Sequence, residues 1–153
     1  MSHTAAGIDF GVDIPFVSHL GFVLTLFADG QSEIRYDPQA EHLNSYSVVH
    51  GGAVMTLLDV TMAMAARAVH DHSGVVTIEM KTSFMCPSHG LLTARGKLLH
   101  RTASLAFTEA TVFDAQNKPC AHATGTFKYI RRLPVGATRV QPFNTASARQ
   151  ADA

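Results

Sequence analysis

Apolar residues dominate one long segment of the chain, residues 48–69, which reads VVHGGAVMTLLDVTMAMAARAV. From Ala53 to Val69, small and apolar residues occupy every side of a helical wheel. This pattern is typical of a helix that protein encloses on all sides, and it predicts a buried central helix. A His-Gly-Gly step at residues 50–52 precedes the apolar run, and one acid, Asp59, interrupts it.

Short apolar stretches on both sides of this segment predict β-strands. Residues 19–27 and 32–36 flank Asp29-Gly30, a strong hairpin turn signal. After the helix, four further strands are predicted over residues 75–85, 91–101, 105–113 and 121–130. In the first of these, strict alternation would place on one face Thr77, Glu79, Lys81 and Ser83.

Consecutive strands with short links favour an antiparallel meander, and the early hairpin can extend it into one sheet. One long helix beside a curved antiparallel sheet is an α+β architecture. We therefore expect a single domain over residues 19–133, after a lead-in at 1–18 with at most a short helical turn. Residues 134–153 are rich in Ala, Thr, Arg, Gln and Ser without apolar periodicity, which predicts a disordered tail.

Composition agrees with one globular domain, since the chain has 153 residues of which 46% are hydrophobic. Twelve Lys and Arg balance twelve Asp and Glu, so the whole-chain charge gives no reason to expect a nucleic-acid or membrane partner. The first residues lack a signal-peptide pattern, and we expect a soluble cytoplasmic protein. The two cysteines, Cys86 and Cys120, are predicted to be reduced thiols.

Asp59 is the first candidate for chemistry. An isolated carboxylate among Leu57, Leu58 and Val60 costs several kcal/mol in desolvation unless a partner compensates it. It could be a structural acid that accepts hydrogen bonds from the backbone or a threonine. It could equally be a nucleophile or a general base, because burial raises the proton affinity of a carboxylate. The residue alone leaves both readings open.

Gly51 and Gly52 lie where the loop becomes the helix. Their bare backbone permits close approach of a ligand to amides that have no partner inside the helix, and the helix dipole favours an oxyanion or a thioester carbonyl there. The simpler alternative is a tight turn. Gly51 and Asp59 are eight positions apart, about 12 Å along one helix, so one carbonyl cannot easily meet both. If both act on it, they come from two copies of the chain across a two-fold axis.

Several other polar residues could complete such a site. Thr77 follows the helix on the next strand, where it can hydrogen-bond Asp59 or a water, although threonine is common in strands for propensity reasons. Asn44 could orient the loop or bind substrate, and His50 is expected to position the loop rather than to act as a base. No metal-ligand spacing is present. Basic residues that could contact a phosphate, or simply be solvated, are Arg101, Lys128, Arg131 and Arg132.

Together these residues resemble a known family. The run of Asn44, His-Gly-Gly at 50–52, Leu58-Asp59 in an apolar helix and Thr77 on the next strand is similar to the hotdog-fold acyl-CoA thioesterases of the phenylacetate-degradation (PaaI) type. The stretches IPFVSHLGF and SFMCP also look like that family, so the resemblance covers about residues 14–131.

The resemblance implies a helix wrapped by a curved sheet, with dimers that pair their sheets edge to edge and often double to tetramers. It implies that Gly51 contacts the thioester carbonyl, that Asp59 is the catalytic carboxylate, and that Thr77 and Asn44 hold substrate or water. Asn and Gly would come from one subunit and the acid and hydroxyl from the other. No metal or redox cofactor is implied, and coenzyme A is part of the substrate. Ser47 departs from the glycine that relatives often have three residues after the Asn.

We therefore predict an acyl-CoA thioesterase whose Asp59 activates water or attacks the carbonyl. The acyl group would lie in an apolar channel, to which His50 and Gly52 would contribute and whose lining would include Met55, Leu58, Met62 and Met64, although methionines on a buried helix are often plain core. One alternative is a non-catalytic acyl-CoA-binding or regulatory hotdog domain, which would be marked by loss of the acid. Another is a dehydratase or hydratase, whose His and acid usually have a different arrangement.

Overall fold

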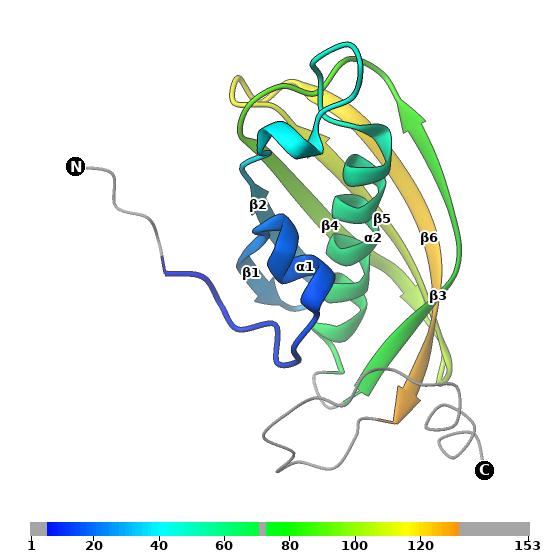
Figure 1. Cartoon of the computed structure of the whole chain (residues 1–153). Helices are drawn as coiled ribbons and strands as arrows, with labels where there is room; N and C mark the ends of the chain where they lie inside the picture. The colour runs from blue at the N-terminus through cyan, green and yellow to red at the C-terminus, as the bar shows by residue number, and fades with distance from the viewer. Residues whose placement is uncertain (1–5, 71–72, 132–153) are drawn as a thin grey trace.

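The computed structural model describes residues 6–70 and 73–131, which form one long helix partly wrapped by a curved sheet (Figure 1). The predicted tail at 134–153 lies outside these residues. In chain order the elements are α1 (Pro15–Leu20), β1 (Val23–Ala28), β2 (Gln31–Tyr36), the 3-10 turn η1 (Ala40–His42), α2 (Gly51–Arg67), β3 (Ser73–Phe84), β4 (Leu92–Arg101), β5 (Leu105–Phe113) and β6 (Pro119–Arg131).

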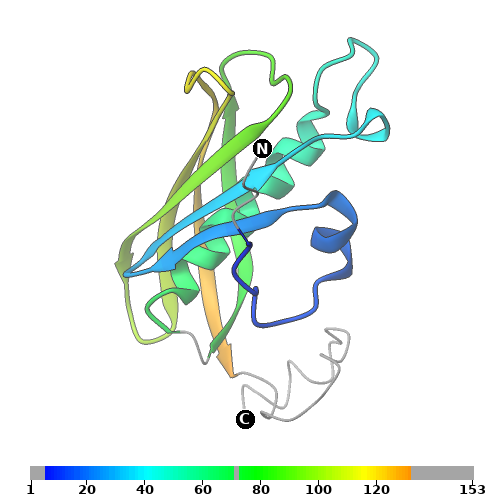
Figure 2. The same cartoon turned by 90° about the vertical axis from the view of Figure 1, so that its left-hand side faces the viewer.

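The sheet has six strands in the order β1-β2-β4-β5-β6-β3, and every neighbouring pair is antiparallel. Its concave side faces α2, as the turned view shows (Figure 2). The predicted hairpin, meander and α+β class are confirmed. The sheet has β3 at one edge, where β6 is its only partner strand within residues 6–70 and 73–131.

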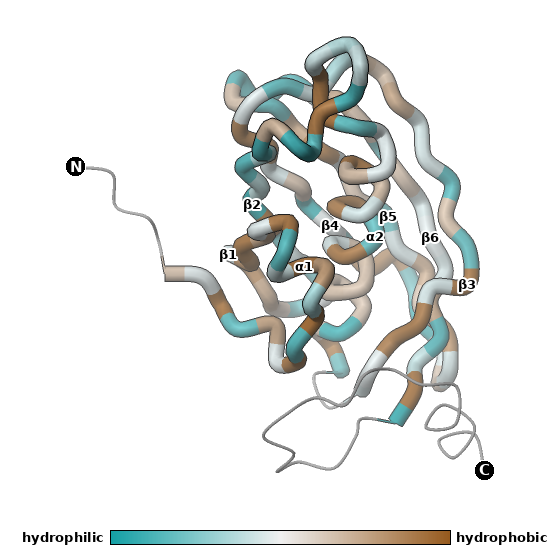
Figure 3. The backbone as a smooth tube through the Cα atoms, in the orientation of Figure 1, coloured by the Kyte–Doolittle hydropathy of each residue, from teal (hydrophilic) through white to brown (hydrophobic). Residues whose placement is uncertain are grey.

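The central helix α2 begins at Gly51, two residues before the predicted start. Apolar residues follow it along its length (Figure 3), and its core-facing side is fully buried at Leu57, Leu58 and Met62. Since these side chains belong to the core between helix and sheet, tertiary burial rather than surface amphipathicity stabilises the helix. In the described part of the chain no helix is long and apolar enough to cross a bilayer.

The expected strand from residue 19 is wrong at its start, because Pro15–Leu20 form α1. Pro15 suits the first turn of a helix, where its missing N–H is not needed. Gly21 ends the helix in the left-handed conformation with φ 73°. Val17 and Leu20 are buried in the core, so the apolar periodicity of this stretch is helical.

The predicted alternation in β3 is also wrong, because the strand contains a bulge. Thr77 pairs with Phe127 and Glu79 pairs with Thr126, so Ile78 is an extra residue between them. Paired residues share a face of the sheet. Thr77 therefore faces the helix side with Met80, whereas Glu79 shares the outer face with Thr126, whose hydroxyl donates to its carboxylate at 2.7 Å.

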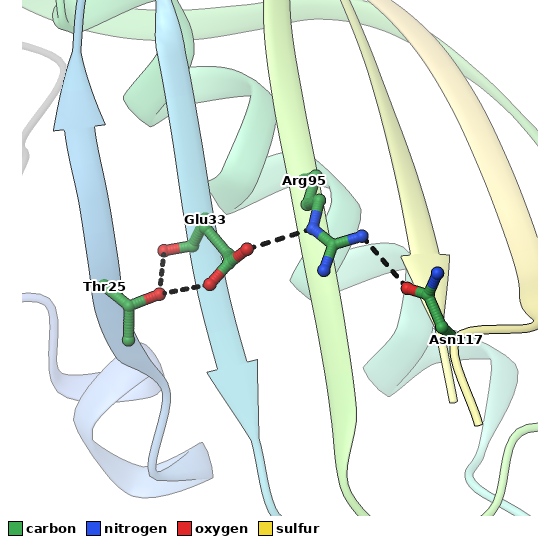
Figure 4. A network of polar contacts seen from close by, with 4 residues as sticks. All are labelled: Thr25, Glu33, Arg95 and Asn117. Atoms are coloured by element: carbon green, nitrogen blue, oxygen red, sulfur yellow. Dashed lines mark hydrogen bonds and ion pairs between the residues drawn. The ribbon is translucent and has the colours of Figure 1, made fainter. Parts of the chain in front are cut away.

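The outer face of the sheet carries a polar network across four elements (Figure 4). Arg95 donates from Nε to Glu33 Oε2 at 3.0 Å and from Nη1 to Asn117 Oδ1 at 3.1 Å. Thr25 Oγ1 donates to Glu33 Oε1 at 2.9 Å, and the Arg95 guanidinium lies 4.9 Å from the Phe113 ring centre. Because 49% of the Arg95 side chain is exposed, this ion pair contributes about 0–1 kcal/mol to stability.

Helix and sheet approach each other closely at Gly96 on β4. Ser32 Oγ donates to the Thr61 carbonyl at 2.6 Å, which ties β2 to the middle of α2. A Cβ atom at position 96 would lie 2.6 Å from Ser32 Oγ and 2.8 Å from the Thr61 carbonyl oxygen. Only glycine therefore permits this spacing between the two layers.

We expect Gly96→Ala to lower the free energy of unfolding by about 1–3 kcal/mol, because the new methyl group must push α2 away from β4. Denaturant unfolding measures this change. Lys97→Ala, at the exposed neighbouring position, is the control and should change stability by less than about 0.5 kcal/mol. Equal stability of Gly96→Ala and the wild type would contradict the packing described here.

Candidate active site

The middle of α2 presents Asp59 beside Thr77 of β3. Thr77 Oγ1 donates a hydrogen bond to Asp59 Oδ1 at 2.7 Å, so the expected contact between them is present. Burial raises the pKa of the Asp59 carboxyl above its ordinary value, and the hydrogen bond from Thr77 opposes part of that rise. The result is a carboxylate with increased proton affinity, held in one orientation by a hydroxyl.

A groove of about 380 Å³ opens over this pair. It is lined by Gly52, Met55, Thr56, Asp59, Thr77 and Met80. The helical members are spaced at i, i+3, i+4 and i+7, so they form one stripe on α2. Thr56 could have been found from that spacing. Met80 could not, because the bulge at Ile78 alone brings it to the same face as Thr77.

Of the predicted acyl-channel residues, only Met55 and Gly52 border the groove. Leu58 and Met62 are completely buried in the core, and 2% of Met64 is exposed. Met62 points toward the sheet, where its Cε lies 3.1 Å from the position that a Cβ on Gly125 would take. All three side chains belong to the hydrophobic core and do not line the groove.

The N-terminus of α2 leaves one amide available. His50 caps the helix, since its Nδ1 accepts from the Gly52 amide at 2.8 Å. The His50 carbonyl accepts from Ala53 at 2.9 Å and from Val54 at 3.1 Å. Within residues 6–70 and 73–131, no hydrogen bond engages the Gly51 amide. Gly51 is thus the first-turn amide that can bind a ligand oxygen.

Asn44 organises the loop before the helix. Its Oδ1 accepts from the amides of Tyr46 at 2.9 Å and Val48 at 3.3 Å. The turn that these bonds close places Ser47 at φ 58°, in the left-handed region that favours glycine. Ser47 therefore adopts the conformation that glycine would provide, at a local cost of about 1–2 kcal/mol. The Nδ2 amide of Asn44 has no bond within the described chain and can donate to a ligand.

The structure thus groups the predicted site residues into two halves. Asp59 and Thr77 lie in the groove, whereas Gly51, His50 and Asn44 lie at the loop and helix N-terminus. Gly51 and Asp59 belong to the same helix, eight residues apart, so they are about 12 Å apart along its axis. A single chain does not bring its free amide and its carboxylate to one reacting atom.

The basic residues considered for phosphate binding lie away from the groove. Arg101 contacts His70 Nε2 beyond the C-terminal end of α2. Lys128 pairs with Val76 and alternates with Phe127, whose side chain is buried on the helix side, so Lys128 is on the outer face. Arg131 is exposed at the end of β6, and Arg132 lies outside the described residues.

Comparisons with known proteins show which family this chain is similar to. Residues 46–121 match the family model of the thioesterase superfamily. The protein named "Putative esterase SSO2140" from Saccharolobus solfataricus is 33% identical over 109 residues, which cover 71% of this chain and 77% of that protein.

Solved structures agree on the fold. Conserved protein PA5202 from Pseudomonas aeruginosa is 27% identical, with a TM-score of 0.74 over 78% of this chain and 96% of that one. The E. coli PaaI protein from the phenylacetic acid degradation operon has a TM-score of 0.71 at 20% identity, over 80% of this chain and 86% of that one. From the match to SSO2140, the superfamily model and these structures, we conclude that the chain belongs to the thioesterase superfamily and has its hotdog fold.

Proposed function

We propose that this protein hydrolyses an acyl-CoA thioester to the free acid and coenzyme A, in a homodimer whose two active sites are shared between subunits. The proposal rests on one observation: the helix α2 carries the two polar functions of the site on different turns. A carboxylate of raised pKa sits in a groove beside Thr77, and an unoccupied amide lies about 12 Å away at the helix N-terminus.

The two halves have complementary roles in acyl transfer. The Gly51 N–H, with the helix dipole behind it, binds the thioester oxygen and stabilises negative charge there. Asp59 of the other subunit takes a proton from water, and the resulting hydroxide adds to the carbonyl carbon. Collapse of the tetrahedral intermediate breaks the C–S bond, and the CoA thiolate receives the proton. Direct attack by the Asp59 carboxylate on the carbonyl carbon is the alternative route.

Thr77 and Asn44 would position the reactants. Thr77 holds one Asp59 oxygen, which leaves the other oxygen free to meet water. The Nδ2 amide of Asn44 would donate to the water or the leaving sulfur. His50 would act indirectly, because its Nδ1 occupies the Gly52 amide and fixes the turn that presents the Gly51 amide.

The edge strand β3 supports the proposed dimer. Its outer edge has no partner strand within the described chain, and an unpaired edge can join a second copy about a two-fold axis. Large apolar side chains lie at or just beyond this strand with 55% of their surface exposed: Ile78, Phe84 and Met85. The groove borders the same strand through Thr77 and Met80, so a copy placed there would lie beside Asp59.

The groove suits an apolar acyl group, since Met55 and Met80 line it and methionine adapts to ligands of several shapes. Aryl acyl-CoAs deserve inclusion among the substrates tested, because one structural relative comes from a phenylacetic acid degradation operon. Arg101, Lys128, Arg131 and Arg132 stay predicted contacts for the CoA phosphates, although none of those that the structure describes lines the groove of a single chain.

The first prediction concerns turnover. Release of free CoA thiol from a panel of aryl and aliphatic acyl-CoAs should reveal a substrate, and Asp59→Asn should lower its turnover at least about a hundredfold, because it removes a positioned carboxylate. Substrate affinity and the far-UV spectrum serve as controls for folding. Binding of acyl-CoA without turnover across the panel would favour the non-catalytic binding domain instead.

The second prediction concerns pH. The base must be ionised, so activity should fall as the pH drops through the raised pKa of Asp59, at a pH above the ordinary value of about 4 for aspartate. Thr77→Val removes the contact that lowers this pKa, and the acid limb of kcat/KM should move to higher pH. Thr77→Ser keeps the hydroxyl and should leave the limb in place. Superimposable limbs for Thr77→Val and the wild type would argue against this role for Thr77.

The third prediction concerns sharing between subunits. Gly51→Pro removes the amide hydrogen at the first helical position, where proline is tolerated, and His50 at ψ 136° already suits a residue before proline. Gly51→Pro and Asp59→Asn should each be inactive alone. After subunit exchange at equal amounts, about a quarter of wild-type activity should return, since half the dimers would contain one intact site of two.

Gly51→Ala is the matched control for this experiment, because it keeps the amide and its Cβ would meet Phe84 at an ordinary contact distance of 3.5 Å. It should retain far more activity than Gly51→Pro. A mixture that stays inactive although mass spectrometry shows mixed dimers would rule out a site shared between subunits.

A further inference from the structure

Two cysteines far apart in the sequence lie side by side where β6 begins. The Cys86 amide donates to the Cys120 carbonyl at 3.1 Å, and the Cys86 thiol donates to the Pro119 carbonyl at 3.4 Å. The Met85 amide donates to the same Cys120 carbonyl at 2.8 Å, so the two segments lie directly against each other here. This contact brings the cysteines near the Cα separation of about 4.4–6.8 Å found in disulfides. Both thiols are free in the structure.

The surroundings of the two thiols differ. Cys120 is completely buried, whereas Cys86 is partly exposed. Burial first, and then the hydrogen bond with the Cys86 thiol, raise the pKa of the Cys120 thiol to about 11. The two thiols donate to successive carbonyls, Cys86 to Pro119 at 3.4 Å and Cys120 to Lys118 at 3.5 Å, so both sulfurs lie at the start of β6. Cys86 is therefore the thiol that a reagent in solution can reach, whereas Cys120 is shielded from solvent.

We propose that Cys86 and Cys120 form an oxidisable dithiol, which low-molecular-weight disulfides convert to an intramolecular Cys86–Cys120 disulfide. The Cys86 thiolate attacks one sulfur of the reagent, forming a mixed disulfide and releasing one thiol. The Cys120 thiolate then attacks the Cys86 sulfur and releases the second thiol. The two protein thiols are oxidised, the reagent is reduced to two thiols, and the two protons pass to those thiols.

The first step prepares the second. While both thiols are free, the hydrogen bond and charge of Cys86 help to hold the proton on Cys120. The mixed disulfide removes those two contributions, and burial, the largest cause of the raised pKa, remains. Because Cys120 lies next to the Cys86 sulfur, the resolving step is expected to be fast compared with release of the adduct by a second external thiol.

The bond would brace the loop that leads to Gly51. Ser88, two residues after Cys86, is buried, and its carbonyl accepts from the Val49 amide at 3.0 Å. Phe84, two residues before Cys86, has its ring 3.5 Å from the Cβ position of Gly51. The segment 84–88 therefore packs against the start of α2 and the residue that precedes His50. Formation of the disulfide itself does not depend on the proposed hydrolysis.

The test treats the full-length protein with oxidised glutathione, followed by acid quenching and intact-mass and peptide mass spectrometry. The wild type should lose two hydrogens, carry no glutathione and yield a peptide linking positions 86 and 120. Its melting temperature should rise by several degrees and return with dithiothreitol, because the cross-link restricts the unfolded chain. Cys120→Ser should retain one glutathionyl group on Cys86, and Cys86→Ser should remain unmodified.

Three results would overturn the proposal: a wild type that keeps a stable glutathionyl group, one that forms only cross-links between chains, or one that does not react. Because Cys120 is buried, Cys120→Ser could fail to fold, and circular dichroism checks this. Cys120→Ala is then the replacement that avoids burying a hydroxyl. The linked peptide of the wild type decides the question without either variant.

Discussion

The proposed mechanism depends on one constraint: a rigid helix carries two polar functions on different turns. The core fixes α2 on most sides, with Leu57, Leu58 and Met62 fully buried and Gly96 allowing no further approach. The helix therefore cannot bend to bring its N-terminal amide to Asp59. The loop side is equally determined, since Asn44 and His50 occupy the other polar groups and leave the Gly51 amide available. The proposed function therefore requires a second copy of the chain to complete the site.

The sheet provides the other half of this arrangement. The bulge at Ile78 turns Thr77 and Met80 toward the helix, which gives Asp59 a hydrogen-bond donor and the groove an apolar wall. The same strand ends the sheet formed by the described residues, so the groove lies next to this edge. A dimer formed through β3 would place a partner helix beside the carboxylate without any change in the core.

The layers of the fold could be predicted from the sequence, because apolar residues recur with different periods in helices and in strands. The all-round apolar run marked α2, and Asp29-Gly30 marked the hairpin. Local patterns failed where one extra residue or a cap decides the geometry. The bulge reversed the face of Thr77 relative to Glu79, and Pro15 with Gly21 made a helix from residues that also suit a strand.

The same limits apply to the site. Asp59 and Thr77 could be paired in advance because a lone acid in an apolar helix requires a donor. The methionines could not be sorted in the same way, since Met55 borders the groove and Met62 belongs to the core although both lie on α2. The contact between Cys86 and Cys120 depends on how β3 and β6 pair, which no spacing in the sequence indicates.

The most direct measurement is a crystal structure of Asp59→Asn soaked with a substrate acyl-CoA, in which the thioester stays intact. The account predicts the thioester oxygen within about 3 Å of the Gly51 amide of one subunit. It also predicts that the carbonyl carbon faces residue 59 and Thr77 of the other subunit. A thioester bound to Gly51 with no second subunit nearby, or bound far from the start of α2, would contradict the shared site.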